Sequence, residues 1–348
     1  MARAATVLTV SLWLLAGCDS DLPRATEVVS MRSLGARLEV LDDEARTTPE
    51  PGERLRVSVP IVFPTLDRDA GELRSMFVGC TAPDRFTGGM PICQELIDAA
   101  LAGEELNDAL PMIEGERLRC SDLQPPRRAQ REAVSLQCVN EAPAPILDVP
   151  ANFEADAMLM LGVICQRGDP YIEPLDPLLF GCEDNDDGEI VRVQGILTVQ
   201  QRAGDRNLNP NLDALTVLRE GVEWLAPDPE MLPPEEGCED DVPAGDPALH
   251  SVVPGTHVIT LRYDGDAREE VDGEPEDLEL TVYTTAGEME RRFTVFEGTE
   301  SGTLEGTLDW DPPKPADIPT GGQLVRFFIT LRDQRGGFEL TERVVCLR

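Results

Sequence analysis

Histidine is the usual general base at neutral pH, and it occurs only twice in the chain, as His250 and His257. Neither histidine lies in a Gly-x-Ser-x-Gly or His-Glu-x-x-His pattern, so neither indicates a serine or zinc hydrolase. We expect His250 in a loop that enters the second half of the chain. We expect His257 at the start of a strand, and both side chains in solvent. Paired carboxylates of the kind that hydrolyse glycosidic bonds carry no specific signal, because the chain has 66 acidic residues.

The stretch "CEDNDDGEI" (182–190) is the place where oxygen ligands are most closely spaced. Set against the calcium loop Asp-x-Asx-x-Asx-Gly, Glu183 takes the first position, Asn185 the third and Asp187 the fifth, and a glycine follows. The first ligand is Glu rather than Asp, and the twelfth position is Gln194 rather than the bidentate Glu. The stretch is therefore a weak calcium candidate. The alternative is a solvated acidic turn between two strands.

The N-terminus has the pattern of a short export signal. Arg3 supplies a positive start, and residues 4–15 form an apolar run that is shorter than the roughly 20 residues of a membrane-spanning helix. The run ends in Leu-Ala-Gly-Cys at 15–18, which resembles the lipobox of bacterial lipoproteins. The resemblance implies that the signal peptide, residues 1–17, is removed, and that Cys18 carries a diacylglycerol and an acylated amine. An ordinary secretory signal with an incidental cysteine is the alternative.

The cysteine count agrees with export. Removing Cys18 from the nine cysteines leaves an even number, and an exported chain sits in an oxidising compartment, so we expect four disulfides. Eight cysteines allow about 105 connectivities, and only their order suggests which neighbours pair. The candidate pairs are Cys80 with Cys93, Cys120 with Cys138, Cys165 with Cys182, and Cys238 with Cys346. The wide spacings and the lack of a Cys-x-x-Cys motif do not resemble zinc sites.

The chain is strongly acidic, with a formal net charge of −36 at pH 7. This charge excludes a nucleic-acid backbone as partner, because such binding depends on Lys and Arg that neutralise phosphates. It also argues against docking on anionic lipid beyond the covalent anchor. A solvated acidic surface that keeps an exported protein soluble is the expected role of the charge. We expect no cofactor apart from the weak calcium candidate.

Short alternating runs predict strands in the first half of the chain. The expected strands are 36–41, 51–63, 73–80, 115–121, 131–139, 157–165 and 189–200. Helical spacing of apolar residues predicts one short helix over 93–106, inside the excursion 81–114. Clustered prolines keep the segment 143–150 out of central strands.

The second half begins at a turn-rich junction, residues 206–212, and continues with further predicted strands. These strands are 212–218, 255–264, 278–285, 290–298 and 302–310, followed by a hairpin within 323–348 that turns at 333–337. The segment 226–247 is a proline- and acid-rich loop tethered at Cys238. A Pro-Gly pair precedes the expected second strand of each half, at 51–59 and 254–262, which suggests a weak internal repeat.

The end "FFITLRDQRGGFELTERVV" (327–345) resembles the last hairpin of Ig-like domains of the PKD and cadherin-like kind. The predicted fold is all-β: two disulfide-stapled, antiparallel Ig-like β-sandwich domains, with a short helix in a loop of the first. The expected boundaries are a tether over 18–33, a first domain over 34–205 with loop excursions, and a second over 206–348. This layout resembles envelope lipoproteins of Gram-negative bacteria. The resemblance carries no catalytic residues to this chain.

These observations predict a lipid-anchored protein of the bacterial cell envelope that acts as a non-catalytic structural or binding module. Such a module binds through loops on a rigid sheet scaffold, and the segments 226–247 and 81–114 are the expected contact sites. The expected partners are the membrane, through the lipid, and an unknown protein or envelope component. An envelope hydrolase that uses carboxylates and a calcium-stabilised adhesin remain alternatives. The sequence leaves open which membrane holds the anchor.

Overall fold

The structure is a computed structural model. It describes residues 25–65, 73–82, 118–122, 128–131, 134–140, 142–173, 176–186, 188–238 and 248–348. Over these ranges the fold is all-β, as predicted: strands alternate with turns, and the helical elements are 3-10 turns of three residues. The helix predicted over 93–106 lies outside the described residues.

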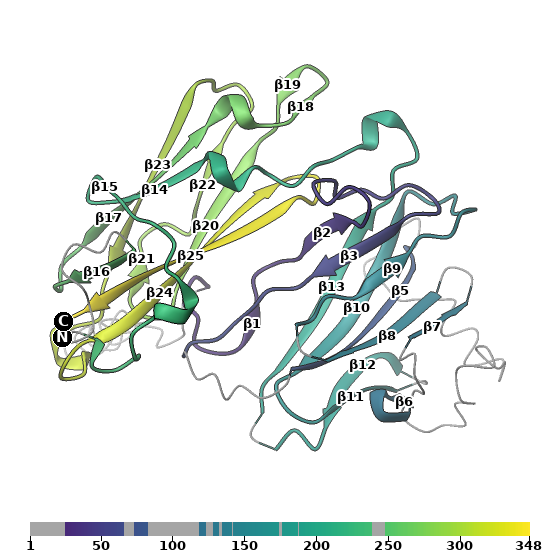
Figure 1. The fold of residues 1–348 in the computed structure, drawn as a ribbon, viewed down its shortest axis with the longest axis horizontal. Coiled ribbons are helices and arrows are strands. Elements are labelled where there is room, and N and C mark those ends of the chain that lie inside the picture. Colours follow the sequence, from purple (N-terminus) through teal and green to yellow (C-terminus); the bar gives the residue numbers. More distant parts are fainter. Residues whose placement is uncertain are drawn as a thin grey trace, which may run out of the picture.

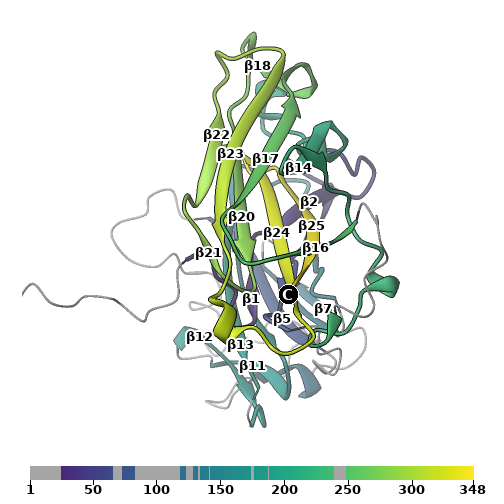
Figure 2. The same ribbon diagram turned by 90° about the vertical axis from the view of Figure 1, so that its left-hand side faces the viewer.

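The second half of the chain forms a β-sandwich of two five-stranded sheets (Figures 1 and 2). One sheet has the order β15 (Val222–Glu223), β14 (Leu215–Arg219), β17 (His257–Asp264), β23 (Thr303–Asp311), β21 (Glu288–Met289). The other has the order β16 (Leu249–Val252), β25 (Phe338–Leu347), β24 (Gln323–Asp333), β20 (Leu278–Thr284), β22 (Phe293–Phe296). The neighbours β14-β17-β23 and β20-β24-β25 correspond to the A-B-E and C-F-G strands of an immunoglobulin fold. A small hairpin, β18 (Glu270–Val271) and β19 (Glu274–Pro275), projects from the loop between β17 and β20.

Aromatic side chains fill the core between these two sheets. The rings of Trp224 and Trp310 both meet Phe327 edge-on, at centroid distances of 5.1 and 4.9 Å. Each indole N–H also has a partner, because Trp224 donates to the carbonyl of Val344 and Trp310 to that of Ala286. Buried indoles thus contribute apolar area without leaving an unsatisfied donor. The residues of β23 alternate between exposed and buried, as the sequence pattern predicts for a strand with one buried face.

The first half repeats this strand order. One sheet contains β2 (Arg37–Val40), β3 (Arg54–Ser58) and β9 (Ile146–Asp148) in that order. The other has the order β13 (Ile190–Thr198), β10 (Ala157–Cys165), β5 (Arg74–Thr81), β8 (Val134–Asn140), β7 (Arg128–Arg131). In chain order, β2-β3-β9 and β5-β10-β13 again match A-B-E and C-F-G. The Pro-Gly pairs noted in the sequence precede β3 and β17, which hold the same place in the two halves.

The first half also has a third, smaller sheet on the outer face of its five-stranded sheet. Its order is β12 (Asp176–Glu183), β11 (Asp169–Glu173), β6 (Leu118–Arg119), and a 3-10 turn, η1 (Cys120–Asp122), follows β6. Side chains of β10 therefore enter two separate cores, Met158 and Met160 on one face and Leu159 and Leu161 on the other. This burial on both faces explains why the run "AMLMLGVIC" is continuously apolar rather than alternating.

Short elements complete the described chain. A two-residue ladder joins β1 (Arg32–Ser33) to β4 (Ile61–Val62) beside the first half. The remaining 3-10 turns are η2 (Ala203–Asp205), η3 (Leu212–Ala214), η4 (Pro229–Met231), η6 (Gly265–Ala267) and η7 (Pro315–Asp317). Strand β9, within the proline-rich segment 143–150, lies at the edge of its sheet, in agreement with the sequence-based expectation.

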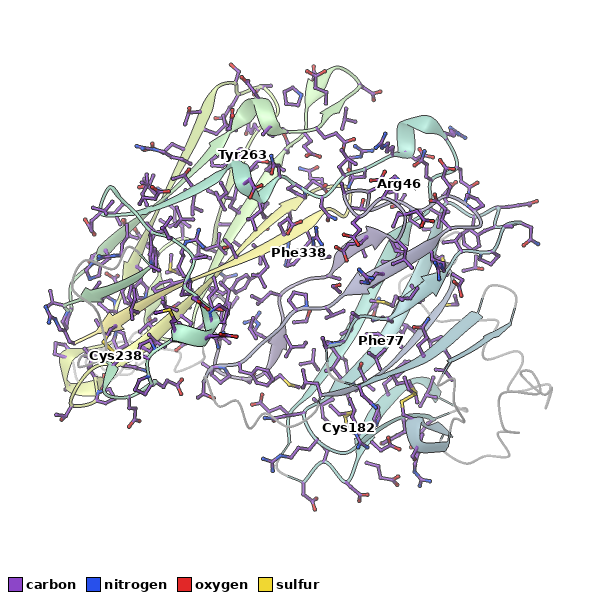
Figure 3. All side chains as sticks on the ribbon, in the orientation of Figure 1. Arg46, Phe77, Cys182, Cys238, Tyr263 and Phe338 are labelled. Carbon is purple, nitrogen blue, oxygen red and sulfur yellow. A yellow bond between two sulfur atoms is a disulfide. The ribbon has the colours of Figure 1, made fainter. Side chains whose placement is uncertain are left out.

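Disulfides staple both halves (Figure 3). Three of the four pairings suggested by the order of the cysteines are present: Cys120–Cys138, Cys165–Cys182 and Cys238–Cys346. The first two connect the small outer sheet to the five-stranded sheet of the first half. The third ties the proline-rich loop to β25. Cys80 is also disulfide-bonded, while Cys93, its suggested partner, lies outside the described residues.

Candidate functional site

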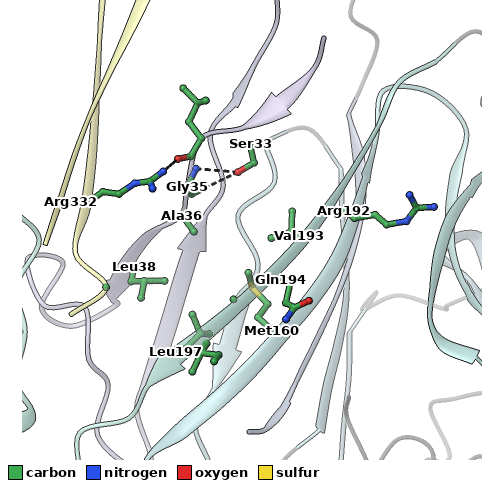
Figure 4. A pocket seen from close by; sticks show the side chains of 14 residues that line it. Ser33, Gly35, Ala36, Leu38, Met160, Arg192, Val193, Gln194, Leu197 and Arg332 are labelled. Carbon is green, nitrogen blue, oxygen red and sulfur yellow. Dashed lines mark hydrogen bonds between the residues drawn. The ribbon is translucent and has the colours of Figure 1, made fainter. Parts of the chain in front are cut away.

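A groove with a volume of about 430 Å³ lies beside strand β13, where the two halves meet (Figure 4). Three parts of the chain form it: the segment that leads into β2, strand β13 with its neighbour β10, and the last hairpin of the second half. The lining residues are Ser33, Leu34, Gly35, Ala36, Leu38, Met160, Arg192, Val193, Gln194, Gly195, Ile196, Leu197, Arg332 and Gly336. Although the chain has 66 acidic residues, this lining contains no Asp or Glu.

Strand β13 presents a free edge to the groove. It pairs with β10, and no other described strand pairs with it. At one end of the ladder the N–H of Gln166 donates to the carbonyl of Glu189, at 3.1 Å. At the other end the N–H of Val199 donates to the carbonyl of Asp156, at 2.8 Å. Backbone groups of successive residues point to opposite sides of a strand. The even-numbered residues of β13 therefore direct their N–H and C=O groups away from β10.

The floor of the groove is apolar. Leu38, Met160 and Leu197 line it and also belong to the core between the two sheets of the first half. Gly195 leaves open space here, because a Cβ built on it has no atom within 4 Å. The groove thus combines an apolar floor with a row of unpaired backbone donors and acceptors, which is the composition of a peptide-binding surface.

The last hairpin closes one side of the groove by direct contacts between the halves. The guanidinium of Arg332 donates to the carbonyl of Leu34, and Arg37 pairs with Glu339 at 2.7 Å. The ring of Phe338 packs on Gly35 so closely that a Cβ there would lie 2.3 Å from the ring. Because Gly35 lines the groove, the shape of this site depends on how the hairpin docks on the first half.

A buried polar network fixes that docking a short distance along the hairpin. The side chain of Asn207, in the junction segment, donates to Thr47 of the first half at 3.1 Å and to Asp333 of the second half at 2.9 Å. The other carboxylate oxygen of Asp333 accepts from the backbone of Arg335 and Gly337, each at 2.7 Å. One carboxylate therefore shapes the hairpin turn and holds it against the first half.

Glu276 lies at the same junction with one buried carboxylate oxygen that has no hydrogen-bond partner. Burial, together with the negative charges of Asp333 and Glu269, raises the pKa of Glu276 to about 7. The backbone N–H of Glu269 and the charge of Arg335 act in the opposite direction. The protonation state of this junction therefore changes near neutral pH.

The calcium candidates have protein partners where the structure describes them. Glu183 pairs with Arg119 of β6. The side chain of Asn185 accepts from the N–H of Arg167 at 3.0 Å and donates to the carbonyl of Gly188 at 2.6 Å. Asp187 lies outside the described residues, and no group of three potential metal ligands occurs among the described ones. The structure shows a turn between β12 and β13, in which the side chains of Glu183 and Asn185 bind other parts of the protein.

The two histidines differ from the sequence-based expectation. His250 lies in strand β16 rather than in a loop, because its segment pairs with the last strand. His257 begins β17 as expected but does not face solvent freely. Its ring stacks on Trp310 at 5.6 Å, and its Nε2 lies 2.9 Å from the carbonyl of Val253. These contacts give His257 a packing role.

The structure describes only part of the two contact sites predicted from the sequence. The loop 226–247 is described up to Cys238, and backbone bonds hold it against β24, from Gly237 to Gly322 and from Leu324 to Glu235. Of the excursion 81–114, residues 81–82 are described. Cys18 lies outside the described residues, and among those that are described we find no helix with the length and apolarity needed to span a bilayer.

No protein-family model matches this chain, and no curated protein matches it. Among solved structures, a red sea bream transglutaminase aligns with a TM-score of 0.22 at 7% identity, over 90% of this chain and 31% of that one. A Salmonella alpha-2-macroglobulin mutant aligns with a TM-score of 0.20 at 9% identity, over 94% of this chain and 17% of that one. The chain spans less than a third of either protein, and at these TM-scores neither likeness bears on function.

Proposed function

We propose that this chain is a lipid-anchored, non-catalytic binding module of the bacterial cell envelope, and that its ligand occupies the groove beside β13. The N-terminal pattern that ends in Cys18 supports the anchor, and the disulfides support an oxidising compartment outside the cytoplasm. The groove supports binding, and it is the observation that carries the proposal. The sequence predicted loops as the binding sites. We propose this groove instead, because most of its lining lies on strands and three of its residues, Leu38, Met160 and Leu197, belong to the packed core of the first half.

The lining also favours binding over hydrolysis. A hydrolase that uses carboxylates needs two of them converging on one cleft, and the groove has none. A second cavity, of about 460 Å³ beside Pro254 and Arg348, also has no Asp or Glu in its lining. No observation on the described residues favours the hydrolase, so binding is the function that we propose.

Photo-crosslinking of the full-length protein in intact cells tests the binding function. A photoreactive residue replaces Ile196, which is half exposed at the groove, and a second probe replaces Val222, which is similarly exposed on the opposite sandwich. We expect a discrete crosslinked product from position 196 and none from position 222. Gly195→Leu fills the groove and removes the product. Gly204→Leu is the matched control, since a Cβ at Gly204 also has open space. Equal crosslinking in both variants would reject the groove as the binding site.

Metabolic labelling tests the anchor separately. Cells that express the full chain are grown with an alkyne-tagged palmitate, and the protein is followed in membrane and soluble fractions. We expect label on the parent and its sedimentation with membranes, because a thiol at position 18 accepts the lipid. Cys18→Ala removes both. A labelled Cys18→Ala protein would show that the anchor lies elsewhere.

A further inference from the structure

The two halves of the chain have the same strand order but differ at one edge. In the second half, β16 lies parallel to β25, with Leu249 opposite Val344 and Val252 opposite Leu347. Strand β25 holds the G position of that sandwich, so its outer edge is covered. Strand β13 holds the G position of the first half, and among the described strands none covers its outer edge. The groove occupies the place that β16 fills in the second half.

The backbone groups on the free edge of β13 can form hydrogen bonds with another strand. Arg192, Gln194 and Ile196 line the groove, and their N–H and C=O groups point away from β10. No hydrogen bond to these backbone groups occurs among the described residues. An uncovered edge of this kind is a template for another strand. The lining covers six successive residues of β13, 192–197, a length of about 17 Å that suits an extended segment of four or five residues.

The segment that leads into β2, residues 31–38 of the same chain, runs alongside β13 without pairing with it. The N–H of Met31 bonds to the side chain of Glu189, just before β13. Leu38, seven residues later, lines the groove together with Leu197 near the far end of β13. The segment from Met31 to Leu38 therefore runs in the same direction as β13 and is separated from it by the groove.

We propose that the groove accepts an extended segment of a partner protein, which adds to β13 as a parallel strand and places alternate apolar side chains on the floor formed by Leu38, Met160 and Leu197. This inference rests on the proposed binding function and specifies its mode. The second half contains such a parallel strand within the chain itself: β16 pairs with β25 and contributes Val252 to the core of that sandwich. A lining without Asp or Glu fits uncharged inserted side chains. A second copy of this chain does not fit as the partner, because two copies that each carry a net charge of −36 repel each other.

Amide hydrogen exchange of the free protein is the first test. The amides of Val191, Val193 and Gly195 bond to β10, so we expect them to exchange slowly. The amides of Arg192 and Gln194 face the groove and exchange at least tenfold faster. Slow exchange of both sets, or a dimer in solution, would overturn the proposal, since the edge would then already be covered.

Selection from a displayed library of heptapeptides supplies a defined probe. The selected peptide is expected to protect the amides of Arg192, Gln194 and Ile196 from exchange. N-methylation of peptide residues that face β13 should weaken binding about tenfold for each lost hydrogen bond. Methylation at the intervening residues tests the same peptide with its β13-facing donors intact. Binding that is equally sensitive to both patterns would overturn strand addition.

A protein variant separates this mode from the binding function itself. Gln194→Pro removes an outward N–H while sparing the bonds to β10, a position that proline tolerates on an edge strand. Slow exchange of the Val193 and Gly195 amides verifies that the ladder with β10 remains. We expect peptide affinity to fall about tenfold. If Gly195→Leu abolishes binding and Gln194→Pro does not, the groove binds its ligand by another mode and strand addition is rejected. If neither variant affects binding, both proposals fail.

Discussion

The side-chain amide of Asn207 donates a 2.9 Å hydrogen bond to Asp333, across 126 residues of sequence. Asn207 is fully buried and lies in the junction segment between the two halves. Asp333 ends β24 and begins the turn of the last hairpin. This contact, together with the bond from Asn207 to Thr47, joins both halves to one side chain. The groove beside β13 is formed by both halves, so its shape depends on this junction.

Asn207→Ala should lower the free energy of unfolding by about 2–3 kcal/mol, because it leaves a buried carboxylate oxygen of Asp333 without its donor. Urea unfolding monitored by tryptophan fluorescence measures the change. Asn140→Ala, at an exposed position, is the control and should stay within about 0.5 kcal/mol of the parent. Equal effects of the two variants would show that the junction bond contributes nothing measurable.

Glu276 should make stability depend on pH near neutrality. The pKa of Glu276 is raised in the folded protein, to about 7. Its contribution to the stability of the fold is therefore fully present below the unfolded-state pKa and is lost as pH rises through 7. Glu276→Gln removes this loss. The free energy of unfolding of the variant should therefore exceed that of the parent by about 2 kcal/mol at pH 8 and by much less at pH 5. Unfolding free energies at both pH values test this. Glu274→Gln, at an exposed position nearby, is the control. A constant difference at the two pH values would contradict the prediction.

The Cys238–Cys346 disulfide should contribute more stability than the Cys120–Cys138 disulfide, because it closes a loop of 108 residues rather than 18. Loop-closure entropy of the unfolded chain predicts about 5 kcal/mol for the long loop and about 3 kcal/mol for the short one. Replacing both cysteines of each pair by serine and measuring urea unfolding gives the two values. The reverse order would show that native-state contacts outweigh the entropy of the unfolded chain.

Gly35→Ala should destabilise the contact between the halves by about 1–3 kcal/mol, because its Cβ would lie 2.3 Å from the ring of Phe338. Phe338→Leu removes the obstructing ring atoms. The double variant should therefore be more stable than the sum of the two single changes predicts, and a double-mutant cycle in urea measures the difference. Strict additivity would mean that the two residues do not meet in solution.

Local pattern was enough to predict most strands of this protein. The run over 157–165 coincides with β10, and the alternation before and after 333–337 corresponds to β24 and β25. Strands β11 and β12 were not predicted, because each has a proline as its second residue. Proline weakens a strand pattern. Only their pairing with each other, and the disulfide from Cys165 to Cys182, places them in a sheet.

By itself the sequence determined the all-β class, the even set of cysteines after Cys18 and the hairpin at the end, because these depend on residue type, count and short-range period. The tertiary structure alone decided that β13 is an edge, that the backbone N–H and C=O groups of its even-numbered residues face the groove, and that Asn207 meets Asp333. Such features depend on contacts between residues far apart in the chain. No local period encodes them, because they arise only when both sandwiches have folded and packed together.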